Sequence, residues 1–184
     1  MNLRWIVPGL LAFLPLGAFA DEACHKPVEV AGFEGEQDFV QTRWFKGVSN
    51  PLISSGTITL SEDSVKWAVL EPVSIVTTVT EGGIVQSVEG GPPERVSGGQ
   101  SSSPLLEQSG LFDLLKGDLS RVDQFYSVSA PEPVDNGWSI SLVPSDAKMR
   151  EFVDRITVKG CRRVSNIHVV QSSGDTLEIA FPVD

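Results

Sequence analysis

The sequence predicts a mainly β (α+β) protein built on antiparallel strands, with one or two helices between the two halves of the sheet. Apolar residues fall on every second position in three short runs between Ser55 and Thr80, and the alternation returns after Gln124. A period of two places apolar side chains on one face of a strand and polar ones on the other. Between these regions, residues 104–117 break the pattern with clustered leucines, which favours a helix.

The first twenty residues have the features of a secretory signal. Residues 1–4 give a short positive start, residues 5–16 are an apolar run, and Ala18-Phe19-Ala20 places small residues where a signal peptidase reads them. The apolar run is too short to cross the ~30 Å of a bilayer core. We therefore expect a cleaved signal peptide over residues 1–20 and, since 184 residues suit one domain, a single domain over residues 21–184.

Export would place the two cysteines in an oxidising compartment. Cys24 and Cys161 are the only cysteines, so they most simply form one disulfide. The chain-entropy model credits the closure of such a long loop with about 4–5 kcal/mol. Lipidation of Cys24 would need small and apolar residues before it, which Asp21-Glu22-Ala23 does not supply. The prediction is a soluble periplasmic protein without a lipid anchor.

Charge and motif content exclude several classes of function. The net charge of −10 is expected to repel phosphate backbones and anionic membrane surfaces, so we predict no nucleic-acid partner. The two histidines, His25 and His168, belong to no metal-ligand spacing, and no G-x-S-x-G element is present. We therefore predict no cofactor, no metal and no catalytic residue, and a protein that is not an enzyme.

The N-terminal elements follow from proline, glycine and period. Residues 21–36 are expected to form an irregular arm, because a proline and two glycines interrupt any helix. Residues 38–48 predict the first strand, with Phe39, Gln41 and Arg43 on one face.

The central stretch predicts a meander with one apolar face, separated by the turn sequences SEDS and EP. Its three alternating rows are Ile58 and Leu60, then Val65, Trp67 and Val69, then Ile75, Thr77 and Val79. A weaker strand is expected over residues 84–88. Residues 89–104 are predicted to be a surface loop, since their glycines are not followed by the Gly-Lys-Ser/Thr of a phosphate-binding loop.

Residues 104–117 predict a helix that begins at Pro104 and ends at Gly117. Two interpretations remain open. The segment is either an ordinary core helix packed on the sheet, or a lid whose apolar side faces a cavity.

After Gln124 the alternation predicts several further strands. Their apolar rows are Trp138, Ile140 and Leu142, then Ile156 and Val158, then Ile167 and Val169, then Leu177, Ile179 and Phe181. The sequences PEPVDNG, PSDAK, KGCRR and SSGD between them are typical of turns in an antiparallel sheet.

The order of several short motifs resembles the LolA family of periplasmic outer-membrane lipoprotein carriers, over nearly all of the chain after residue 20. The motifs are F-x-Q at Phe39 and Gln41, Ser55-Gly56-x-Ile58, Val65-Lys66-Trp67, Pro72, P-L-L…F-x-L-L-x-G from Pro104, Tyr126, G-W-x-I-x-L-x-P from Gly137, and a final strand ending in Phe181. Each motif is weak alone, and their order and spacing carry the resemblance.

The resemblance implies an unclosed, strongly curved antiparallel β-barrel or half-barrel with helices as a lid. It also implies an apolar hollow that receives lipoprotein acyl chains from an inner-membrane transporter and passes them to an outer-membrane acceptor. Burial of a methylene group is worth ~0.8 kcal/mol, so an acyl chain does not cross an aqueous compartment unshielded. A movable lid would permit loading and release.

The candidate binding residues lie on the predicted sheet and the predicted lid. The sheet-side lining is Phe39, Ile58, Leu60, Val65, Trp67, Val69, Ile140 and Leu142, and the lid residues are Leu111, Phe112 and Leu115. The alternative for each is plain core packing. For the whole protein, the alternative is a non-catalytic interaction module of the cell envelope, with a packed core and an exposed apolar patch.

Three features depart from the family pattern. Glu62-Asp63 stands where the family places a basic residue and a proline, the family's N-terminal amphipathic helix is replaced by the irregular arm, and a Cys24–Cys161 bridge is not a family hallmark. In the family that basic residue is an arginine that latches the lid. The departures favour a LolA-like paralogue whose cargo is another fatty-acyl or polyene lipid.

Overall fold

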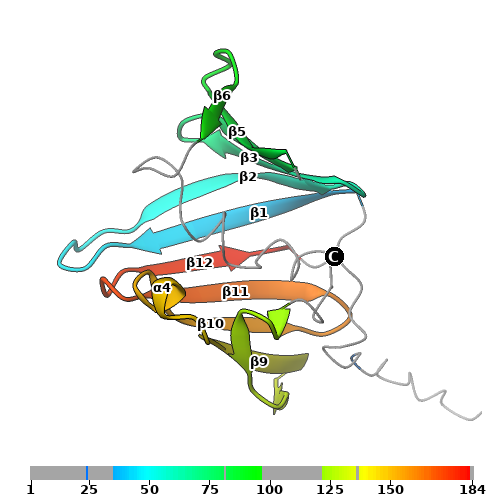
Figure 1. Ribbon diagram of the computed structural model, residues 1–184, viewed down its shortest axis with the longest axis vertical. Helices are drawn as coiled ribbons and strands as arrows, with labels where there is room; N and C mark the ends of the chain where they lie inside the picture. The colour runs from blue at the N-terminus through cyan, green and yellow to red at the C-terminus, as the bar shows by residue number, and fades with distance from the viewer. Residues whose placement is uncertain (1–23, 25–34, 81, 97–121, 136, 183–184) are drawn as a thin grey trace, which may run out of the picture.

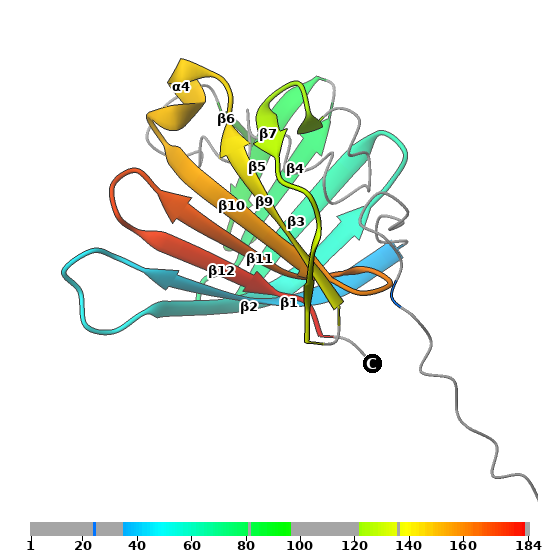
Figure 2. The same cartoon turned by 90° about the horizontal axis from the view of Figure 1, so that it is seen from below.

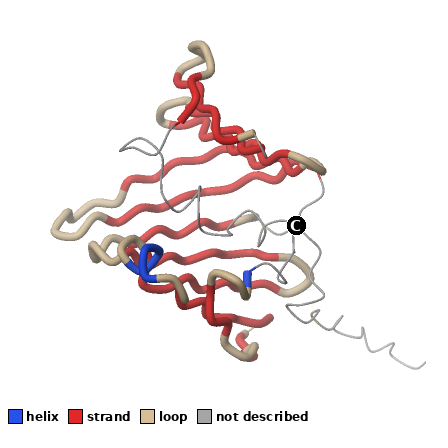
Figure 3. Tube along the Cα trace, in the orientation of Figure 1, coloured by secondary structure: helices blue, strands red, loops and turns tan. Residues whose placement is uncertain are grey.

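The computed structural model describes residues 24, 35–80, 82–96, 122–135 and 137–182, and this part of the chain is almost entirely β-structure (Figures 1 and 3). The strands are β1 (Gly35–Trp44), β2 (Leu52–Leu60), β3 (Ser64–Glu71), β4 (Ile75–Thr80), β5 (Gly83–Val88), β6 (Glu94–Val96), β7 (Tyr126–Val128), β8 (Glu132–Val134), β9 (Gly137–Pro144), β10 (Val153–Gly160), β11 (Val164–Gln171) and β12 (Thr176–Ala180). The mainly β class predicted from the alternation is confirmed.

All described strands belong to one antiparallel sheet. Its order is β6-β5-β4-β3-β2-β1-β12-β11-β10-β9-β7, and β8 pairs with β9 beside this path. Strands β1 to β6 form one meander. Strands β9 to β12 form a second, to which β7 and β8 add by pairing with β9, and the two meanders meet where β1 pairs with β12. The first and last strands are thus neighbours at the middle of the sheet.

The sheet is open and curled. Its two ends, at β6 and at β7 and β8, do not pair with each other. In Figure 2 the middle strands β1, β2 and β12 lie lowest, and both ends of the sheet rise on the same side. Along the sheet order the strand direction turns progressively, as the right-handed twist of β-strands requires. The predicted unclosed, curved antiparallel sheet is therefore confirmed.

The predicted lid of helices is not supported. One helix has both its ends within the described residues, the four-residue α4 (Ala147–Arg150), which packs against β9 and β10. Residues 104–117, for which the sequence predicted a helix, lie outside the described residues. No helix in the described ranges has the length and apolar character needed to cross a bilayer.

Several boundaries differ from the prediction, and local hydrogen bonds explain them. Strand β1 covers residues 35–44, not 38–48, because Val48 N–H donates to the carbonyl of Phe45 at 3.0 Å and Gly47, with φ of 82°, turns the chain. Asp146 accepts hydrogen bonds from the N–H groups of Lys148 and Met149, so the predicted turn PSDAK contains α4.

Two short strands also occupy segments predicted to be loops. Strand β6 lies in the predicted loop 89–104 and pairs with β5, and β8 lies in the predicted turn 131–137 and pairs with β9. Pairing with a neighbouring strand decides these conformations, and three residues are too few to show a period in the sequence.

The predicted disulfide is present. Cys24 and Cys161 are bonded across 137 positions of sequence, with their Cα atoms 4.5 Å apart. Cys161 directly follows β10, and its carbonyl accepts a hydrogen bond of 2.9 Å from the indole N–H of Trp138. The bridge fastens residue 24 to the C-terminal meander.

Candidate functional site

The buried core lies on one face of the sheet, which we call the apolar face. Its members alternate along the strands with residues of the opposite face, as at Ile167 and Val169, which are fully buried on either side of half-buried His168. The same alternation separates Phe39, which is 1% exposed, from Val40, which is 43% exposed. The sheet therefore has one core face and one outer face, as the period of two predicted.

In the N-terminal meander, the apolar face is organised around Gly56. Phe39 stands directly opposite Gly56 in the β1–β2 register. Because Gly56 has no side chain, the Phe39 ring reaches across β2 to Trp67 on β3, with ring centroids 4.6 Å apart and planes tilted by 42°. This aromatic pair joins three strands and is of the tilted kind that aromatic rings favour.

In the C-terminal meander, cross-strand pairs form two continuous apolar rows. The first row runs through Ile140, Val158, Ile167 and Ile179 on β9, β10, β11 and β12. The second row runs in parallel through Leu142, Ile156, Val169 and Leu177. At β1 the first row meets Gln41 and the second row meets Arg43. Both rows are thus apolar over four strands and end at polar residues of β1.

The structure brings the predicted sheet-side residues together on this face. Phe39, Ile58, Val65, Trp67, Ile140 and Leu142 are buried in one cluster, and Leu60 and Val69 are half-buried against it. The predicted lid residues Leu111, Phe112 and Leu115 lie outside the described residues. Residues that line a cavity and residues of a packed core would both lie together on this face, so the binding roles of these residues remain predictions.

Polar groups on the apolar face are few, and none of them was predicted from the sequence to bind a ligand. In β4 and β5 the buried hydroxyl of Thr77 accepts a hydrogen bond of 3.1 Å from the Gln86 amide. At β1, where the two meanders meet (the seam), Arg43 donates from Nη2 to the Gln171 side-chain oxygen at 3.4 Å, and its guanidinium lies 4.7 Å from the centre of the Phe45 ring. The alternation placed Arg43 on this face but gave no reason to select it.

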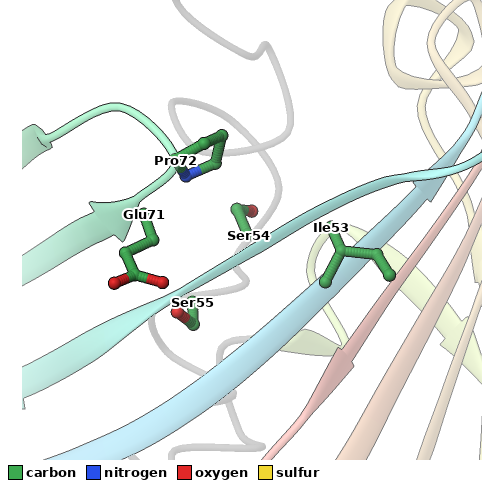
Figure 4. A pocket seen from close by; sticks show the side chains of 5 residues that line it. All are labelled: Ile53, Ser54, Ser55, Glu71 and Pro72. Carbon is green, nitrogen blue, oxygen red and sulfur yellow. The ribbon is translucent and has the colours of Figure 1, made fainter.

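A small depression lies where β2 and β3 meet. It has a volume of about 330 Å³ and is lined by Ile53, Ser54, Ser55, Glu71 and Pro72. Figure 4 shows Ser54 on one side of the β2 ribbon and Ser55 on the other, as expected for neighbouring residues of a strand. The depression lies next to the register shift between Ser55 and Gly56. Its polar groups are the hydroxyls of Ser54 and Ser55 and the carboxylate of Glu71.

The described residues contain no arrangement that indicates a metal centre. No group of three or more histidine, cysteine, aspartate or glutamate side chains within these ranges could hold a metal ion. Within the described residues, this face offers mainly apolar surface and aromatic rings, with the Thr77 hydroxyl, the Gln86 amide and the Arg43 guanidinium among its polar groups.

Comparisons with known proteins give a family. No curated protein matches the chain. Among solved structures, a LolA superfamily protein from Nitrosomonas europaea is similar at 8% identity and a TM-score of 0.45, over 85% of this chain and 88% of that one. A putative outer membrane lipoprotein-sorting protein domain from Vibrio parahaemolyticus is similar at 10% identity and a TM-score of 0.40, over 81% and 84%.

The sequence itself matches a family model described as outer membrane lipoprotein carrier protein LolA-like, over residues 32–178. The match begins before β1 and ends within β12, so it covers β1 to β11 and the first part of β12. The chain belongs to the LolA-like family.

Proposed function

We propose that the protein is a non-catalytic periplasmic carrier that holds the acyl chains of lipoproteins or related lipids against the apolar face during transfer between membranes. The observation that carries this proposal is the continuity of that face over an open, curled sheet, where apolar rows cross four adjacent strands. Membership of the LolA-like family supports it.

The poor solubility of acyl chains in water explains why such a carrier is needed. Each methylene of an acyl chain costs ~0.8 kcal/mol to leave in water, so a long chain remains in its membrane unless another apolar surface replaces the bilayer. An open sheet with one apolar face can supply that surface without any covalent chemistry. Transfer then requires only that binding is strong enough to extract the chain and weak enough to release it.

The proposal includes a place and partners. The Cys24–Cys161 disulfide fits an oxidising compartment, and together with the signal peptide predicted over residues 1–20 it supports the periplasm as the site of action. An inner-membrane transporter would load the cargo, and an outer-membrane acceptor would receive it. The acidic net charge of −10 supports a protein that does not bind nucleic acid.

The experiment that tests the proposal is mass spectrometry of an organic extract from protein purified out of a native periplasm. We expect a stoichiometric lipid or lipopeptide in the extract. In parallel, the purified protein is titrated with an apolar dye whose fluorescence rises in apolar surroundings, and we expect saturable binding. A protein that carries no lipid and does not enhance the dye would contradict the carrier function.

Variants on the two faces of the same strands connect binding with the apolar face. Leu60 and Val69 are half-buried, so Leu60→Glu and Val69→Glu introduce a charge there at lower cost than at fully buried Ile58. We expect both variants to bind the dye at least tenfold more weakly, since an apolar ligand would deprive the carboxylate of its water. Lys66→Glu, on the exposed outer face of β3, is the matched control and should bind as the wild type does.

A second candidate is supported by a different observation. Four large apolar side chains lie exposed where β1 and β3 end and β2 begins: Trp44, Ile53, Leu70 and Val73, each 42–58% exposed. An interaction module of the cell envelope would use such a patch to bind a partner protein and would keep the apolar face as an ordinary core. The lipid extraction separates the two functions, because this module would be empty and would not bind the dye.

A further inference from the structure

Arg43 is a charged residue on the apolar face, and its cross-strand neighbours are uncharged. The β1–β2 register is regular from Gly35 to Arg43, so Arg43 points to the same side as Phe39. Its cross-strand neighbours are Leu52 on β2 and Leu177 on β12. A guanidinium is therefore framed by two leucines on the core side of the sheet.

The hydrogen-bonding capacity of this guanidinium is mostly unused within the described part of the chain. Its Nε is buried and donates to no acceptor, and its single hydrogen bond is the long 3.4 Å contact from Nη2 to the neutral Gln171 amide. No carboxylate of the described residues forms an ion pair with it, and the Phe45 ring is its other partner. Buried donors are ordinarily paired, and an arginine fork fits a carboxylate with two parallel bonds.

The position of Arg43 relates it to a bound chain. The row Leu142, Ile156, Val169 and Leu177 ends at Arg43, so the charge stands at one end of a continuous apolar line. From β9 to β1 this line crosses four inter-strand spacings, or about 19 Å at ~4.8 Å for each spacing. That length suits an extended long-chain acyl tail with its polar end at β1.

We propose that Arg43 binds the carboxylate head group of a single-chain acyl lipid whose tail lies along this row. The inference rests on the carrier function proposed above and names the class of cargo, a fatty acid, whether saturated or polyene. One guanidinium matches the single charge of a carboxylate. The nearby cation, Lys46, is directed elsewhere, since its side chain lies over Gly174 in the β11–β12 turn and its backbone N–H donates to Asp175.

A conjugated tetraene fatty acid, whose own fluorescence rises in apolar surroundings, provides the test together with its methyl ester. The two probes share the tail and differ in the head-group charge. Loss of a hydrogen bond to a charged group corresponds to a change in affinity of about tenfold or more. We expect the wild type to bind the acid at least tenfold more tightly than the ester. Arg43→Gln should lower acid affinity about tenfold and leave ester affinity unchanged.

The controls separate a head-group contact from a structural effect. Arg155→Gln removes a cation from the exposed outer face of β10 and should bind both probes as the wild type does. Arg43→Lys keeps the charge without the fork, so its preference for the acid should lie between those of the wild type and Arg43→Gln. The acid-to-ester ratio of the wild type needs no variant, so it remains a test if Arg43→Gln folds poorly.

Two outcomes overturn the inference, and a third overturns the carrier function instead. Equal affinity of the wild type for acid and ester would contradict a carboxylate site. An Arg43→Gln variant that loses acid and ester equally would show that Arg43 supports the fold and does not recognise the head group. A wild type that binds neither probe would contradict the proposed carrier function itself.

Discussion

At the scale of single residues, Gly56 is constrained by the backbone beside it. A Cβ added there would fall within bonding range of the Ala68 carbonyl oxygen and 2.9 Å from the Cα of Val69. Backbone atoms of a central strand cannot move aside as a flexible side chain can, so Gly56→Ala must shift β2 away from β3 and disturb the Phe39–Trp67 pair. We expect a loss of about 3 kcal/mol in the free energy of unfolding, measured by urea denaturation.

The matched control for this substitution is Gly82→Ala. A Cβ at Gly82 would meet only the Thr80 hydroxyl at 3.5 Å, an ordinary contact, in an exposed turn. Its unfolding free energy should stay within about 0.5 kcal/mol of the wild type. Equal stabilities of the two variants would contradict the close approach of β2 and β3 at Gly56.

At the scale of elements, the short helix α4 depends on its first residue. The Asp146 carboxylate accepts hydrogen bonds from the N–H groups of Lys148 at 2.8 Å and Met149 at 3.3 Å. A helix of four residues has few bonds of its own, so the cap is a large part of its stability. Asp146→Ala is expected to lower the free energy of unfolding by about 1 kcal/mol, whereas Asp146→Asn should retain most of it. Loss of stability in the asparagine variant equal to that in the alanine variant would contradict the cap.

The same scale shows what the sequence could and could not predict. The long strands were predictable because strands with one buried face must alternate. Residues 138–142 show this, since Trp138, Ile140 and Leu142 are buried and the two serines between them are half-buried. Strands β6 and β8 were not, because three residues show no period and pairing with β5 and β9 decides their conformation. For the candidate site, the alternation placed Phe39 and Ile58 on the apolar face. The importance of Arg43 depends on the register with β12, which local sequence does not encode.

At the scale of the whole molecule, the fold places the first and last strands of the sheet at its centre. Strands β1 and β12 are neighbours, and the two meanders extend from them in opposite directions. Each meander carries its own half of the apolar face, so the seam at β1 is the place where a ligand contacting both halves must lie. The polar residues Gln41 and Arg43 stand at this seam. Substitutions here are therefore expected to affect ligand preference more than those at the sheet ends.

The Cys24–Cys161 bridge acts at this largest scale, because the two cysteines are 137 positions apart and the loop between them contains strands β1 to β10. Cross-linking restricts the unfolded chain far more than the folded one, and for a loop this long the chain-entropy model gives about 4–5 kcal/mol. The double variant Cys24→Ser/Cys161→Ser should lose a stability of this order in urea denaturation, and reductant should destabilise the wild type but not the variant. Cys24 packs against the core cluster, but neither cysteine belongs to the two apolar rows. The folded variant should therefore still bind the tetraene fatty acid with wild-type affinity. A variant as stable as the oxidised wild type would mean that the unfolded chain is already compact enough for the bridge to restrict it little.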